Sequence, residues 1–171
     1  DAAGTELTMN IPSGKLVKSY EWYRNGEKVT GTTKNLSITE MATYACILTF
    51  SDNTTATYTY KPTQVVTRID GAGAAAVSMT NPGSTTMTGV TVKDQFGDVV
   101  KNATLTVTGF SAGAMTGVTG VSLKSDENGV LVVTTTGAAT ADGDCTMTVL
   151  GKTLTLTTSS TQAKLEVKTW A

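Results

Sequence analysis

One stretch of the chain decides its fold class, Val90-Thr91-Val92-Lys93-Asp94-Gln95-Phe96-Gly97-Asp98-Val99-Val100. Apolar and polar residues alternate up to a turn in which Gly97 can adopt a positive φ, and a second apolar run follows the turn. Such alternation is typical of a half-buried β-strand. The same pattern recurs at 104–108, 146–149 and 153–157, whereas no comparable stretch has helical periodicity. The chain is therefore predicted to be all-β.

Composition supports this fold class and excludes two kinds of partner. The 171 residues include 36 Thr, and this β-branched residue favours pleated, half-buried surface. Thirteen basic and 14 acidic residues give a net charge of −1, so we expect no nucleic-acid partner, because binding a polyanion requires a basic surface. No apolar run approaches the roughly 18 residues of a membrane span, so no membrane insertion is expected. The start at Asp1, without Met or a leader, indicates a piece of a longer polypeptide.

The chain is expected to contain two units. Turn residues separate the strand patterns at the short intervals of antiparallel sandwiches. A boundary is expected near Lys61-Pro62-Thr63-Gln64, because Pro62 cannot donate to a β-ladder and aromatic content falls after it. We predict two tandem β-sandwiches, residues 1–63 and 64–171. Gly71 to Ala76 is interpreted as the loop before a strand in which Val77 resumes the alternation.

The first unit carries an ordered set of strand motifs. Tyr20 to Glu27 predicts a strand with Tyr20 and Trp22 inward and Glu21 and Tyr23 outward, ending in an Asn25-Gly26 turn. Leu36-Ser37-Ile38 and then Tyr44-Ala45-Cys46 follow. A Trp, an alternating apolar pair and a Tyr-x-Cys corner in this order resemble strands C, E and F of an I-set-like immunoglobulin domain. The resemblance implies that the Tyr44 hydroxyl ties the corner and that Trp22 packs on Cys46.

Two features depart from that family. No Cys lies upstream of Trp22, so the intersheet disulfide is missing. Strand A is also not evident, since Thr8 and Met9 already have the pattern of strand B. We expect either that the upstream piece carrying strand A was removed, or that a strand from elsewhere covers that edge.

The second unit has two turn motifs of its own. The stretch from Val90 to Val107, followed by Ser125-Asp126-Glu127-Asn128-Gly129-Val130, resembles the bacterial immunoglobulin-like repeat of invasin and intimin type over about 66–158. Val99 stands where Pro is common, and Cys145 stands where an aromatic or aliphatic strand residue is usual. The resemblance implies a rigid spacer or display module without catalysis.

Few residues suit catalysis or metal binding. The chain has no His, which removes Ser-His and Cys-His nucleophile pairs, and two Cys do not make a zinc site. Cys46 and Cys145 lie in separate strand patterns and are expected to be buried, unpaired thiols, which indicates folding in a reducing compartment. We predict no enzyme, no cofactor and no metal.

Carboxylates cluster in the turns. Asp94, Asp98, Asp126, Asp142 and Asp144 are expected to cap their own backbone, which accounts for Asp there without a catalytic pair. Loops 125–128 and 142–144 could offer oxygen ligands to Ca²⁺, but ordinary polar hairpin tips are favoured because no full ligand set is present.

The candidate binding residues are aromatic or Arg, the types that anchor interfaces and stack on sugars: Tyr23, Arg24, Tyr58, Tyr60 and Trp170. Tyr58 and Tyr60 share one face of a strand, and that face can equally belong to the core. Trp170 has no following strand to bury it, so it is expected to dock on the sandwich or on a neighbouring subunit.

Three functions are compatible with these features. The favoured one is an immunoglobulin-like module of a phage virion protein (head decoration, tail or fibre), folded in the host cytoplasm and displayed on the virion surface. Its partners would be capsid or tail proteins, or further copies of itself, with weak binding to cell-surface glycans. The alternatives are a stalk segment of an exported bacterial adhesin at the cell surface, and a carbohydrate-binding accessory domain of an enzyme.

Overall fold

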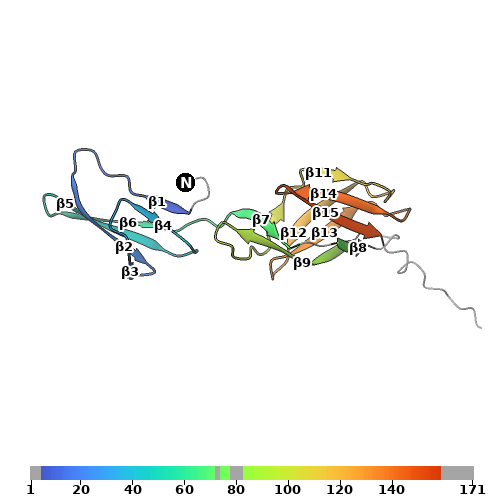
Figure 1. Ribbon diagram of the computed structural model, residues 1–171, viewed down its shortest axis with the longest axis horizontal. Coiled ribbons are helices and arrows are strands. Elements are labelled where there is room, and N and C mark those ends of the chain that lie inside the picture. Colours follow the sequence, from blue (N-terminus) through green and yellow to red (C-terminus); the bar gives the residue numbers. More distant parts are fainter. Residues whose placement is uncertain (1–4, 72–73, 78–82, 159–171) are drawn as a thin grey trace, which may run out of the picture. The chain divides into compact units, whose positions relative to one another are not determined.

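The computed structural model describes residues 5–71, 74–77 and 83–158, and the side chains of all of these except 74–77 and 158. The described residues form strands and connecting turns without a helix, and the chain divides into two compact units, Asp1–Val65 and Val66–Ala171 (Figure 1). The predicted all-β class with sandwiched sheets is confirmed.

Unit 1 places a small sheet over a larger one. Its strands are β1 (Glu6–Thr8), β2 (Val17–Arg24), β3 (Glu27–Val29), β4 (Asn35–Ser37), β5 (Tyr44–Phe50) and β6 (Thr55–Tyr60). The larger sheet has the order β3-β2-β5-β6, and the smaller one pairs β1 with β4; all these pairs are antiparallel. No strand among the described residues lies beside β1 on the side away from β4, where strand A would be expected.

Alternation on β5 builds the core of unit 1. Tyr44, Cys46, Leu48 and Phe50 are all buried, and the residues between them are half-buried. Trp22 lies directly opposite Cys46 in the β2–β5 register and is buried with it, as the resemblance implied. Tyr20, however, is only half-buried, and so are Glu21 and Tyr23, which were expected to point outward.

The corner before β5 is fixed by a side chain. The Tyr44 hydroxyl donates a hydrogen bond to the carbonyl oxygen of Glu40 at 2.9 Å. Asn25, at a positive φ of 49°, ends β2, and its side-chain oxygen accepts from the Thr43 N–H at 3.0 Å. Both bonds hold the chain that leads into β5 against the end of β2.

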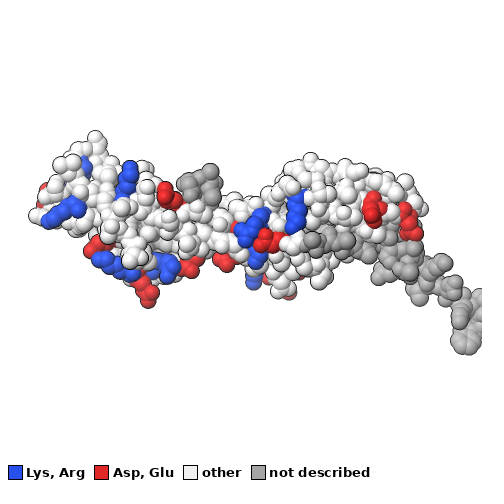
Figure 2. Space-filling view, viewed as in Figure 1, with Lys and Arg blue, Asp and Glu red and all other residues white. Residues whose placement is uncertain are grey.

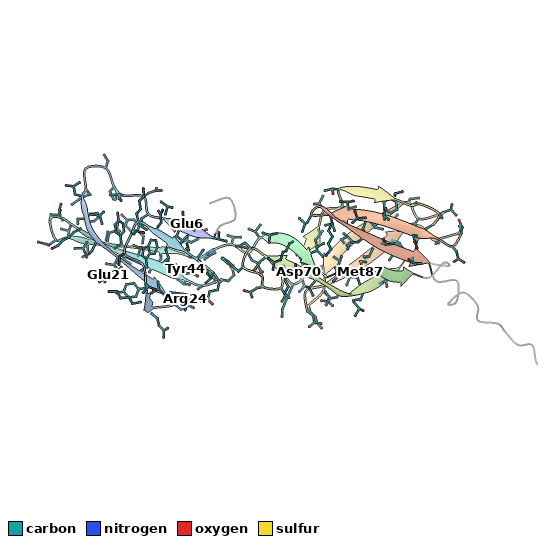
Figure 3. The ribbon with its side chains drawn as sticks, in the orientation of Figure 1. Glu6, Glu21, Arg24, Tyr44, Asp70 and Met87 are labelled. Atoms are coloured by element: carbon teal, nitrogen blue, oxygen red, sulfur yellow. The ribbon has the colours of Figure 1, made fainter. Side chains whose placement is uncertain are left out.

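Unit 2 has two sheets. Its strands are β7 (Val66–Asp70), β8 (Ala74–Val77), β9 (Ser84–Asp94), β10 (Thr104–Leu105), β11 (Gly109–Ser111), β12 (Gly120–Ser125), β13 (Val130–Thr136), β14 (Asp144–Val149) and β15 (Lys152–Thr158). They form the orders β10-β12-β13-β9-β7 and β11-β14-β15-β8. The core between them includes Met87 (Figure 3), Val90, Val92, Leu105, Leu123, Leu131, Val133, Cys145, Met147, Leu154 and Leu156.

Two predicted elements of unit 2 differ from the structure. The strand expected to start at Val77 already begins at Ala74, because Ala74–Val77 pairs in parallel with Thr155–Thr158. The single strand expected over 104–108 ends at Leu105. Leu105 pairs with Leu123 of one sheet, whereas Gly109–Ser111 pairs with β14 of the other, so the chain changes sheets between them.

Candidate binding surface

The predicted binding residues Tyr23 and Arg24 do not form one surface. They are adjacent on β2, and successive side chains of a strand point to opposite faces of its sheet. The Tyr23 hydroxyl donates to Glu21 Oε2 at 3.2 Å, and Arg24 Nε lies 3.0 Å from Glu40 Oε1. Each side chain is therefore already engaged within unit 1. Trp170 lies outside the described residues.

Tyr58 and Tyr60, in contrast, lie together on β6. They stand opposite Cys46 and Tyr44 in the β5–β6 register, so they belong to the face of the sheet that carries the buried core. Their exposed fractions are nevertheless 39% and 50%. Two aromatic side chains on the inner face of a sandwich thus remain open to solvent.

These tyrosines border a groove between β1 and β6, which we call the β1/β6 groove. It has a volume of about 210 Å³ and is lined by Leu7, Met9, Trp22, Tyr44, Tyr58 and Tyr60, together with Glu6, Thr8 and Thr59. Glu6 on β1 and Tyr44 on β5 come from the two different sheets that border it (Figure 3). The groove follows from topology, because a two-stranded sheet lies against a four-stranded one.

A wider hollow lies over β2 and β3. It has a volume of about 670 Å³ and is lined by residues that include Tyr20, Glu21, Lys28 and Gly31. Lys28 Nζ donates to Glu21 Oε1 at 2.8 Å, and this hydrogen bond lowers the pKa of the Glu21 carboxyl. The third charged group, Lys18, donates through Nζ to Asn53 Oδ1 at 3.2 Å. The charged groups of this hollow are thus already engaged within unit 1, so the β1/β6 groove is the better binding candidate.

Carboxylates in two turns of unit 2 serve the backbone. Asp94 is fully buried, and its Oδ1 accepts from the N–H groups of Phe96 and Asp98, both at 2.9 Å. Asp126 Oδ1 accepts from the N–H groups of Asn128 and Val130 at 2.8 and 2.9 Å. Capping is thus confirmed for both residues.

Asp144 behaves differently. It lies at the start of β14, and its Oδ1 accepts from the Thr157 hydroxyl on the neighbouring strand at 2.7 Å, so it links two strands instead of capping a turn. Within the part of the chain that the structure describes, no three His, Cys, Asp or Glu side chains gather in a group that could hold a metal ion.

Both cysteines are free and buried, with exposed fractions of 1% for Cys46 and 0% for Cys145. The expected unpaired thiols are confirmed. Desolvation by burial raises the pKa of each thiol. The two residues lie in different units, and neither is placed as a nucleophile.

Surface charges of both signs are interspersed on the face shown in Figure 2. Several form ion pairs, including Lys15 with Asp52 at 2.7 Å and Arg68 with Asp70 at 2.9 Å. The Lys15 hydrogen bond holds the pKa of the Asp52 carboxyl well below its usual range. In the described ranges, no helix is long and apolar enough to cross a membrane.

Comparison with known proteins gives structural likeness only. No protein-family model and no curated protein matches the chain. The crystal structure of domains 4 and 5 of the S-layer protein SbsC matches with a TM-score of 0.33 and 16% identity, over 90% of this chain and 78% of that chain. A longer structure, rSbsC(31-844), matches with a TM-score of 0.30 and 19% identity, over 88% of this chain but 21% of that chain.

Proposed function

We propose that the chain is a non-enzymatic display module of a phage virion protein, in which β-sandwiches project from a head, tail or fibre. The supporting observation is the pair of buried free thiols, one in each unit. Unpaired Cys in sandwich cores fits folding in a reducing cytoplasm, where virions assemble, better than folding in an oxidising exterior. The half-exposed Tyr58 and Tyr60 would supply weak contacts to cell-surface glycans, which many copies would strengthen.

A stalk segment of an exported adhesin is the second candidate, favoured by the Asp94 turn. We infer that unit 2 is related to the bacterial immunoglobulin-like repeats of invasin and intimin type, because the Asp94 turn resembles the turn motif of those repeats. Such repeats act as spacers, and unit 2 has its own core and satisfied turns. Fold alone does not choose between a virion and a cell surface.

The decisive experiment is peptide mass spectrometry on purified particles and on cell envelopes of the source. Trypsin releases the peptide Asn102 to Lys124, which serves as the marker. High copy number in particles, together with depletion from envelopes, is expected for a virion protein. Enrichment in envelopes, with peptides of a leader and of further repeats, would replace the virion proposal with the adhesin one.

Glycan binding is tested separately. A glycan array probed with the whole chain should lose its signals when Tyr58 and Tyr60 are both changed to Ala. Tyr23→Ala is the matched control, because Tyr23 lies on β2 outside the groove and should leave binding unchanged. An array without any signal for the unaltered chain would remove the glycan part of the proposal.

A further inference from the structure

We propose that residues 163–167 of a second copy of this chain add as a β-strand in the β1/β6 groove, and that copies are thereby linked head to tail. The inference concerns how copies join, and it holds whether a virion or a cell surface displays them. A groove filled in this way no longer offers Tyr58 and Tyr60 to glycans, so glycan contacts would be left to copies whose groove is empty. Its first support is the inner-face position of Tyr58 and Tyr60, opposite buried Cys46 and Tyr44, combined with exposed fractions of 39% and 50%.

The main chain along β6 is suited to pairing. The Phe50 N–H donates to the Thr54 carbonyl oxygen at 2.9 Å, which sets the alternation of the β5–β6 ladder. In an antiparallel ladder every second residue bonds to the partner strand, so Ala56, Tyr58 and Tyr60 bond to β5. The N–H and C=O groups of Thr57 and Thr59 therefore point away from β5, toward the outer edge of β6. Within the described part of the chain, β6 is the last strand of its sheet. An added strand would therefore find hydrogen-bond partners at two alternate residues.

The apolar walls of the groove specify what the added strand must present. Leu7 and Met9 line one side, Tyr58 and Tyr60 line the other, and buried Trp22 is at the base. A strand that fits must alternate, with aliphatic side chains toward the groove and polar ones toward water.

The sequence contains such a segment after β15, Ala163-Lys164-Leu165-Glu166-Val167-Lys168. Its odd positions are Ala, Leu and Val, and its even positions are all charged. The aliphatic set can therefore face Leu7, Met9 and the two tyrosines, while the charged set faces water. These residues lie outside the described ranges.

The distance along unit 2 selects a second copy as the donor. Asp94 at the end of β9 is opposite Val66, and β9 has 11 residues, so it spans about 33 Å. β8 continues from β7 away from Val66, and Thr158 pairs with Val77 at the end of β8 (Figure 1). Leu165 follows Thr158 by seven residues and reaches at most about 25 Å. The chain's own segment, running back along unit 2, would therefore end before it reached Val66, where unit 1 begins. The groove of another copy can instead be brought to the segment, so its distance is not set by the length of unit 2.

A mixing experiment identifies the donor. Copies carrying Thr8→Cys are mixed with isotope-labelled copies carrying Lys168→Cys and treated with a short bismaleimide, while the buried native thiols stay unreactive. We expect a cross-linked product of one labelled and one unlabelled chain. Lys28→Cys on β3, at the edge of the four-stranded sheet opposite β6, replaces Thr8→Cys as the matched control and should give at least tenfold less product.

The cross-link also tests the alternative donor. A single chain carrying both Thr8→Cys and Lys168→Cys should link to other chains. A predominantly internal link would overturn the second-copy assignment. Absence of any specific product, in a chain that sediments as a monomer at every concentration, would overturn the proposal as a whole.

Variants then test the two sides of the contact by sedimentation. Leu165→Asp with Val167→Asp should raise the dissociation constant at least tenfold, whereas Lys164→Ala on the other face should change it little. Thr59→Pro removes one N–H at the edge of β6, and Pro is tolerated on edge strands. Thr59→Pro should weaken association while Thr59→Ala, which keeps the N–H, does not. Equal association of all four variants would contradict strand addition.

Discussion

Asp94 and Asp126 illustrate how single side chains determine the turns of unit 2. Each carboxylate accepts two backbone N–H groups from the residues that follow it, at 2.8–2.9 Å. The N–H groups of Phe96, Asp98 and Val130 are partly buried, and a buried donor left unpaired costs about 1–3 kcal/mol, whereas the Asn128 N–H is exposed. A short acidic residue is thus required by local geometry, which explains acidic turns without any catalytic role.

The Tyr44 hydroxyl makes a testable contribution to unit 1. Tyr44→Phe removes the bond to the Glu40 carbonyl and should lower the free energy of unfolding by about 1 kcal/mol. Urea unfolding followed by Trp22 fluorescence measures this in a Trp170→Phe background, since the chain has two Trp. Tyr23→Phe, which removes a longer surface bond, is the control. Equal effects of the two changes would contradict a special role for the corner.

The thiols provide a second prediction at this scale. Burial raises the pKa of Cys46 and of Cys145, so both should hold their protons at pH 8 and resist a thiol reagent in the native chain. Denaturant should release two reactive thiols per chain. Because the folded pKa exceeds the unfolded one, this contribution to stability is present below about pH 8.5 and is lost as the pH rises through the folded pKa. Rapid labelling of either thiol in the native chain would contradict this prediction and show that the core around that thiol opens to solvent.

Between β7 and β8, the chain passes from one sheet of unit 2 to the other. Gly71 lies at this change with a φ of 92°, and an added Cβ would collide with the carbonyl oxygen of Gly89. Lys152 Nζ donates to the carbonyl oxygen of Gly71 and thereby ties the switch to the start of β15. A glycine at this position lets the backbone at the end of β7 pass close to Gly89 before the chain enters the other sheet.

Gly71→Ala is therefore expected to destabilise unit 2 by about 2 kcal/mol or more, through both the positive φ and the collision. Gly120→Ala is the matched control, because its added Cβ meets nothing within 4 Å and its φ is not in the positive range. Calorimetry of the two variants compares them. A Gly71→Ala chain as stable as the control would disprove the proposed constraint.

Elements could be predicted from the sequence where the interactions that form them lie within a few neighbouring residues. Alternation identifies the buried face of β5, and Asp94 marks its turn because a capping carboxylate acts on the next few residues. Ala74–Val77 gives no such signal, since three small residues show no alternation and a parallel partner about 80 residues away makes them a strand. Likewise, Tyr58 and Tyr60 were correctly placed on one face, but their exposure depends on the width of the opposite sheet, which no local pattern records.

At the scale of the whole molecule, each unit has its own core. The large buried cluster around Leu131 contains residues of unit 2 alone, while Trp22, Cys46 and Leu48 belong to unit 1. Leu131→Ala should therefore lower the stability of unit 2 by about 2–4 kcal/mol and leave the Trp22 transition in place. Leu48→Ala should do the reverse. A shift of both transitions by either variant would show that the units unfold as one.

The parallel pairing of β8 with β15 determines how unit 2 resists stretching. A load applied through Val66 acts first on β7, which pairs with β9, and then draws β8 backward along its axis, whereas a load applied through Thr158 draws β15 forward. In parallel strands these two loads oppose each other along the same line, so the four residue pairs from Ala74–Thr155 to Val77–Thr158 are sheared together. Antiparallel end strands loaded in this way would open one pair at a time. Tension applied through Val66 and Thr158 is therefore expected to meet shear resistance at the β8–β15 contact, and not the successive opening of single pairs.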